Sequence, residues 1–113
     1  YCGAVSAAAG AVSGIAWLDG ESEEIIKKTI INTICTVGGM VCDGAKPSCA
    51  SKVAAALGTA ILSLEMAKRG SAFSVGEGLV MDTAENTIKS IGRMASQGME
   101  NTDNIILQIM LGN

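Results

Sequence analysis

The sequence predicts an all-α domain of about five helices. Apolar residues recur at helical spacing in several segments, and no segment shows a convincing alternation of apolar and polar residues, the pattern of a strand. Of the 113 residues, 49% are hydrophobic but only 3% are aromatic. The core must therefore be built from small side chains that pack closely. This length accommodates a single core, so we treat residues 1–113 as one domain.

The first predicted helix covers residues 3–18, which read GAVSAAAGAVSGIAWL and carry no charge. We interpret this run as a buried core helix that ends at Asp19-Gly20. It is short for a membrane span, which needs about 20 apolar residues. It also lacks the basic start of a signal peptide. We therefore expect no membrane role and a cytoplasmic protein.

Two longer helices follow. The stretch ESEEIIKKTIINTICTV predicts a helix capped by Ser22, with glutamates at the positive end of its dipole. Gly38-Gly39 ends or loosens that helix. Pro47 is predicted in the first turn of the next helix, where its missing N–H is not needed. Lys68, Arg69 and Gly70 are typical of that helix's C-terminus.

The last third of the chain predicts an irregular stretch and two further helices. Residues 71–82 contain two glycines and show no periodicity. One helix is expected from Thr83 to about Gly98 and another from Thr102 to about Leu111. The methionines of this region are expected in the core or in an interface: Met94, Met99 and Met110.

The charge balance excludes one class of partner. There are 11 acidic and 8 basic residues, and no basic patch interleaved with aromatic residues is visible. Such a patch is the usual mark of a nucleic-acid-binding surface. We therefore expect no nucleic-acid partner.

Four cysteines carry the chemistry of the chain, in a sequence without histidine. Disulfides would suit a small secreted domain, but this chain is hydrophobic enough to build its own core. A structural zinc site would more often show a close CxxC pair or histidine ligands. The cysteine spacings also match none of the common ferredoxin patterns. Spacing alone leaves the role of the cysteines open.

Local context separates the cysteines into two groups. Cys2, Cys42 and Cys49 lie where loops meet helices, and thiolates are favoured at helix N-termini. Cys35 lies inside a helix beside isoleucines, where a buried free thiol is ordinary. We therefore predict three candidate ligands and one packing cysteine. Three thiolates on a four-iron cluster would leave one iron open, as a Lewis acid.

Three stretches carry a family resemblance: CGAVSAAAGAVSGIAWL, GMVCDGAKPSCASK and TIKSIGRMASQGMENTDNIILQIMLG. They resemble the C-terminal portion of the L-cysteine desulfidase family, which is related to the iron–sulfur L-serine dehydratase alpha chain. The likeness covers nearly all 113 residues, and CDGAK with its second cysteine is the most specific part. The resemblance implies that Cys2, Cys42 and Cys49 hold a [4Fe-4S] cluster, whereas Cys35 matches no ligand position.

The resemblance also implies a function and a missing part. Members of the family are several times longer, and their N-terminal part supplies a catalytic cysteine and much of the active site. Residues 1–113 would then be the C-terminal iron–sulfur domain of a longer enzyme, inactive alone, with the general base elsewhere. That enzyme would eliminate sulfide from L-cysteine, giving pyruvate and ammonia, with the substrate sulfur on the open iron. The alternatives are L-serine dehydration through the same cluster and a non-catalytic helical interaction module.

Residues near the candidate ligands have two interpretations each. Asp43 and Lys46 flank Cys42 and could orient the substrate or tune the cluster, or they could be loop-capping and solvated charges. Ser48 and Ser51 could bind the substrate carboxylate through backbone donors at the helix start, or act as simple N-caps. The expected partners are the amino acid substrate and the N-terminal part of the enzyme or another copy of the chain.

Overall fold

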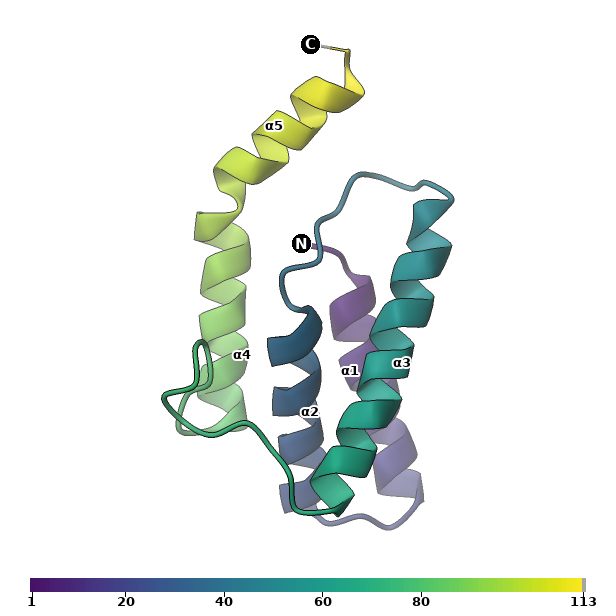
Figure 1. Ribbon diagram of the computed structural model, residues 1–113, viewed down its shortest axis with the longest axis vertical. Helices are drawn as coiled ribbons and strands as arrows, with labels where there is room; N and C mark the ends of the chain where they lie inside the picture. Colours follow the sequence, from purple (N-terminus) through teal and green to yellow (C-terminus); the bar gives the residue numbers. More distant parts are fainter. Residues whose placement is uncertain (113) are drawn as a thin grey trace.

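The computed structural model describes residues 1–112, and all regular structure in this range is helical. The elements are α1 (Ala4–Leu18), α2 (Glu23–Val37), α3 (Ser48–Lys68), α4 (Ala84–Arg93), the short π-helical segment η1 (Met94–Gly98) and α5 (Glu100–Met110). Figure 1 shows α1, α2 and α3 as a bundle, α4 beside α2, and α5 extending beyond the bundle. The predicted all-α fold of about five helices is confirmed.

Helices α1 and α3 pack closely because their contacts are made largely by alanine. The hydrophobic cluster between α1 and α3 consists of buried residues with mostly small side chains: Ala8, Val12, Ala16, Ala56, Ala60 and Leu64. Small side chains let helix backbones approach one another. The uncharged run at residues 3–18 is therefore a core helix, as predicted, although Trp17 and Leu18 at its end are exposed.

Helix α4 joins the bundle through a second hydrophobic cluster. Val5 and Ala9 of α1, Ile34 of α2 and Ile91 of α4 are its buried members. Gly38 lies at the end of α2, and a Cβ atom there would lie 3.3 Å from the Ile91 side chain and closer still to backbone. The glycine thus allows α4 to pack against the end of α2.

A buried asparagine ties the loop after α3 to the bundle. The Asn32 amide donates to the carbonyls of Ser63 and Ser71, at 3.3 Å and 3.1 Å, and its oxygen accepts from the Phe73 N–H at 3.1 Å. Asn32 is fully buried, and a buried polar group is tolerated when its hydrogen bonds are made. The sequence analysis did not single out this residue.

Most predicted helix ends are confirmed. The Ser22 hydroxyl accepts from the Ile25 N–H at 3.2 Å, and the Thr83 hydroxyl caps α4 in the same way. Gly20 and Gly70 follow α1 and α3 with φ values of +77° and +81°, which suit glycine. Pro47 differs slightly from the prediction, since it immediately precedes α3 instead of lying in its first turn.

The predicted boundary near Gly98 is confirmed within two residues. The helical run from α4 through η1 ends at Gly98, Met99 forms a turn, and α5 begins at Glu100 instead of Thr102. What the sequence did not indicate is the π-helical form of residues 94–98. The Met99 N–H donates to the Met94 carbonyl at 3.0 Å, a five-residue spacing that defines a π-turn. The chain bends at this junction, and α5 leaves the direction of α4 in Figure 1.

Helix α5 is largely exposed and packs against η1 alone among the described elements. Most of its apolar side chains are open to solvent: Ile105, Leu107, Ile109 and Met110, followed by Leu111. Met94 and Met99 are partly buried, whereas Met110 is not a core residue. A Cβ atom on Gly44 would lie 3.1 Å from the Met110 methyl carbon, so the end of α5 touches the loop before α3.

Only α3, among the described residues, is long and apolar enough to cross a membrane when judged by length and composition. A core helix of a soluble protein passes the same test, and α3 packs against α1 and α2. This is weak evidence for a membrane span.

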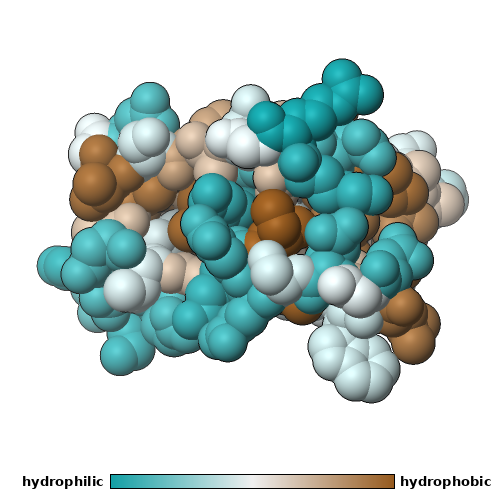
Figure 2. Space-filling model, turned by 90° about the horizontal axis from the view of Figure 1, so that it is seen from below, coloured by the Kyte–Doolittle hydropathy of each residue, from teal (hydrophilic) through white to brown (hydrophobic). Residues whose placement is uncertain are grey.

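Figure 2 shows the end of the bundle away from the N-terminus, where hydrophilic residues surround separate hydrophobic patches.

Candidate functional site

Three segments that carry cysteines meet at one end of the bundle. They are the N-terminus with Cys2, the loop of residues 39–47 with Cys42, hereafter the cysteine loop, and the first turn of α3 with Cys49. The Cys2 N–H donates to the Met40 carbonyl at 2.8 Å, which fixes the start of α1 against the cysteine loop. Figure 1 shows the N-terminus beside this loop.

The Cys49 thiol organises the second half of the cysteine loop. Its sulfur lies 3.1 Å from the Gly44 carbonyl, to which it donates, and 3.4 Å from the Lys46 nitrogen, whose N–H it accepts. Gly44 has a φ of +88°, a conformation that side chains rarely adopt. The glycine and the thiol together turn the chain back toward α3.

Lys52 holds the first half of the same loop. From one turn into α3, its ammonium donates to the Val41 carbonyl at 3.0 Å and to the Asp43 carboxylate at 2.6 Å. The hydrogen bond with Asp43 is the main cause that raises the pKa of Lys52; the charges of Asp43, Cys2 and Cys49 add to it, and burial opposes it. The same hydrogen bond lowers the pKa of Asp43. Both groups are therefore ionised at neutral pH.

The sequence analysis missed Lys52. The signal was available, because Lys52 follows Cys49 by three residues on a predicted helix and so lies on the same face. The sequence does not indicate that the Lys52 ammonium contacts Val41 and Asp43, because these residues precede it by eleven and nine positions.

The three predicted ligands differ in exposure. Cys2 is buried, Cys49 is intermediate and Cys42 is exposed, and all are free thiols. Their segments are in contact, yet within residues 1–112 no three Cys, His, Asp or Glu side chains are positioned together to hold a metal ion. The ligand role of the three cysteines stays a prediction.

The fourth cysteine has a different environment. Cys35 is partly buried and packs against the hydrophobic cluster that contains Ile34 and Ile91. Burial raises the pKa of its thiol. A protonated thiol among apolar side chains behaves as a small hydrophobic group.

The other predicted residues lie at the same end of the molecule. Asp43 is paired with Lys52, whereas Lys46 is exposed and contributes its backbone N–H to Cys49. Ser48 and Ser51 are exposed in the first turn of α3. Pro47 occupies the N-cap position and no side chain caps the helix, so the N-cap interpretation of the serines is wrong. Their role in binding a substrate stays a prediction.

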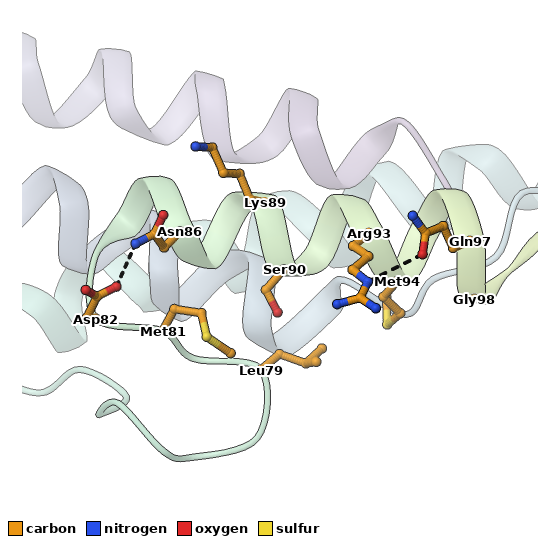
Figure 3. Close-up of a pocket in the computed structure, with 10 residues that line it drawn as sticks. All are labelled: Leu79, Met81, Asp82, Asn86, Lys89, Ser90, Arg93, Met94, Gln97 and Gly98. Carbon is orange, nitrogen blue, oxygen red and sulfur yellow. Dashed lines mark hydrogen bonds between the residues drawn. The ribbon is translucent and has the colours of Figure 1, made fainter.

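A separate open groove of about 760 Å³ runs along α4 and the loop before it. Figure 3 shows its lining: Leu79, Met81, Asp82, Asn86, Lys89, Ser90, Arg93, Met94, Gln97 and Gly98. The polar side chains bind their own neighbours, Asp82 with Asn86 at one end and Arg93 with Gln97 at the other. No cysteine lines this groove, so it is distinct from the cysteine end.

The fold and the cysteine end define an all-helical domain with free thiols on converging segments. Comparison with known families gives a match to the serine dehydratase alpha chain over residues 1–108. The chain therefore belongs to the serine dehydratase alpha chain family. The relation suspected from the CDGAK loop is confirmed at this level.

Individual relatives carry an uninformative name. The chain is 51% identical to a UPF0597 protein of Lachnoclostridium phytofermentans and 50% identical to one of Treponema denticola, each over 98% of this chain. A UPF0597 protein of Finegoldia magna is 42% identical. The chain spans only 27%, 26% and 27% of the lengths of these three relatives. No solved structure gives a significant match.

Proposed function

We propose that this chain is the iron–sulfur-binding portion of a lyase that eliminates the β-substituent of an amino acid, with L-cysteine as substrate. The products would be sulfide, pyruvate and ammonia. The family match over residues 1–108 supports an iron–sulfur lyase. The observation that carries the proposal is the meeting of the segments of Cys2, Cys42 and Cys49, because free thiols from separate segments are the donors that iron–sulfur clusters use.

The donor set suits a [4Fe-4S] cluster, and the chain supplies further groups around it. When bound by three thiolates, such a cluster offers one open iron as a Lewis acid for the departing sulfur. Lys52 places a positive charge at the end of α3 that carries Cys49, and it holds the residues on both sides of Cys42. The backbone amides around Ser48 and Ser51, at the start of α3, would bind the substrate carboxylate. Asp43, held by Lys52, would support the site by fixing the loop.

The rest of the active site would come from a longer protein. The relatives are about four times as long as this chain, since it covers 27% of the first of them. Helix α3 exposes Val53, Ile61 and Leu62, and α5 is exposed along most of its length. We assign these apolar surfaces to contact with the N-terminal part of the same enzyme, which would also provide the general base. The free thiols suit a reducing compartment such as the cytoplasm.

Replacing Cys42 by serine in the complete protein tests the proposal. We expect Cys42→Ser to lose the iron absorbance of the anaerobically reconstituted protein and its sulfide release from L-cysteine together. Cys35→Ala is the matched control, because Cys35 packs against the core, and it should retain both signals. Retained sulfide release in Cys42→Ser would contradict the ligand assignment. A wild-type protein that stays colourless on reconstitution would indicate a non-catalytic helical module.

A second candidate is the dehydration of L-serine by the same residues. The matched family is described as the serine dehydratase alpha chain, which favours a hydroxyl leaving group. The two candidates differ in the affinity of the leaving atom for iron, since sulfur is the softer ligand. Turnover of L-cysteine and L-serine by one preparation, compared as kcat/KM, separates them. Faster elimination from L-serine would overturn the assignment of L-cysteine.

A further inference from the structure

The Lys52 ammonium contacts the residues on both sides of Cys42. It donates to the carbonyl of Val41, the residue before, and to the carboxylate of Asp43, the residue after. Only 18% of the Lys52 side chain is exposed, so its methylene stem is fixed against the protein while its charged end holds the loop. A single side chain thus holds the backbone from which Cys42 projects.

The anchoring of the cysteine loop is divided among three groups. The Cys2 N–H holds Met40, Lys52 holds the residues around Cys42, and the Cys49 thiol holds Gly44 and Lys46. A Cys49 sulfur that binds iron as a thiolate gives up its donation to the Gly44 carbonyl, since the proton is gone. Lys52 loses nothing in that exchange. Its two contacts, like the backbone hydrogen bond of Cys2, can therefore persist in both states of the loop, and they are the side-chain contacts nearest to Cys42.

We propose that Lys52 is a positioning residue that presents Cys42 beside Cys49 before and during cluster binding. Hydrogen bonds to charged groups are stronger than neutral ones, and those of Lys52 also link the loop to a stable helix. Because the loop is already ordered, cluster binding would lose less conformational entropy and would be more favourable. The assignment rests on the proposed function for its purpose, but the holding of the loop is a property of the metal-free protein and is measurable there.

Hydrogen–deuterium exchange of the metal-free complete protein tests the holding directly. Lys52→Met removes the ammonium and keeps an apolar stem. The two hydrogen-bonded amides that join this loop to its surroundings, those of Cys2 and Lys46, should then exchange about tenfold faster, as expected when the anchor of the loop is lost. Lys52→Arg restores a donor and should exchange more slowly than Lys52→Met. Lys68→Met is the matched control, since Lys68 is another ion-paired lysine of α3, and it should leave exchange at Cys2 and Lys46 unchanged.

A second readout links the loop to the cluster. Iron and acid-labile sulfide bound per chain after anaerobic reconstitution should fall in Lys52→Met and recover in Lys52→Arg. Asp43→Asn removes the negative charge from one of the two contacts and leaves a neutral acceptor, without touching the buried stem. It should give an intermediate exchange rate even where Lys52→Met folds poorly. Wild-type exchange at Cys2 and Lys46 in both Lys52→Met and Asp43→Asn would overturn the assignment. A wild-type protein that binds no iron overturns the proposed function instead, while the exchange data still decide the role of Lys52.

Discussion

The α1–α3 bundle and helix α5 differ in how far their apolar side chains are buried. The bundle buries small side chains such as Ala56 and Ala60 completely, and α1 and α3 approach closely as a result. Helix α5 carries larger apolar residues, yet Ile109 is 67% exposed and Leu107 is 53% exposed. The difference shows that burial in this chain follows the availability of a partner surface and not side-chain size. The helices of the bundle pack against one another within residues 1–112. Among the regular elements described there, α5 packs against η1 alone, and its end also touches the cysteine loop at Gly44.

The largest expected effect is from overfilling the bundle. Ala60→Leu adds three carbons where the side chain is fully buried among Val12, Ala16 and Leu64. Such overpacking costs about 2 kcal/mol of unfolding free energy. Urea denaturation of the chain measures this, with Leu62→Ala as control, because Leu62 is 60% exposed in the same helix. Equal stability of Ala60→Leu and the wild type would show that α1 and α3 are less closely packed than described.

A smaller effect should appear in thiol reactivity, which compares the inside of the bundle with the cysteine loop. Alkylation requires the thiolate, and burial raises the pKa of Cys35. The rate at Cys35 should therefore keep rising with pH above the range of an ordinary thiol. At pH 8, Cys42 should react faster than Cys35, because Cys42 is exposed to the reagent whereas Cys35 is partly buried.

Mass spectrometry of peptides after timed treatment with iodoacetamide resolves the two sites. Unfolding in denaturant provides the control, because the two rates should then converge. Faster alkylation of Cys35 than of Cys42 in the folded protein would contradict its place against the core.

The smallest effect is expected from polar substitution on α5. Ile109→Ser should change the unfolding free energy of this chain by less than about 0.5 kcal/mol, since an exposed side chain loses little burial. In the complete protein the same substitution should cost more, because we assign the α5 surface to contact with the remaining part. Thermal denaturation of both forms gives the comparison. An equally small loss of stability in this chain and in the complete protein would show that α5 does not contact the remaining part of the protein.

The extent of sequence-based prediction follows the range of the interactions involved. The helix starts at Ser22 and Thr83 and the turns at Gly20 and Gly70 were predictable, because caps and positive φ values depend on neighbouring residues. The π-helical form of residues 94–98 was not, because its five-residue hydrogen-bond spacing leaves no mark on the apolar pattern of so short a segment.

By itself the sequence determined the helical fold, the close packing of small residues and the location of Cys2, Cys42 and Cys49 where loops meet helices. These features follow from periodicity, composition and local caps. Only the tertiary structure decided that Asn32 holds residues 71–73, that Lys52 reaches across the cysteine loop and that α5 lies outside the core. Those contacts depend on how segments far apart in the chain are placed relative to one another. That placement is set by the packing of the helices, and a local sequence pattern does not reveal it.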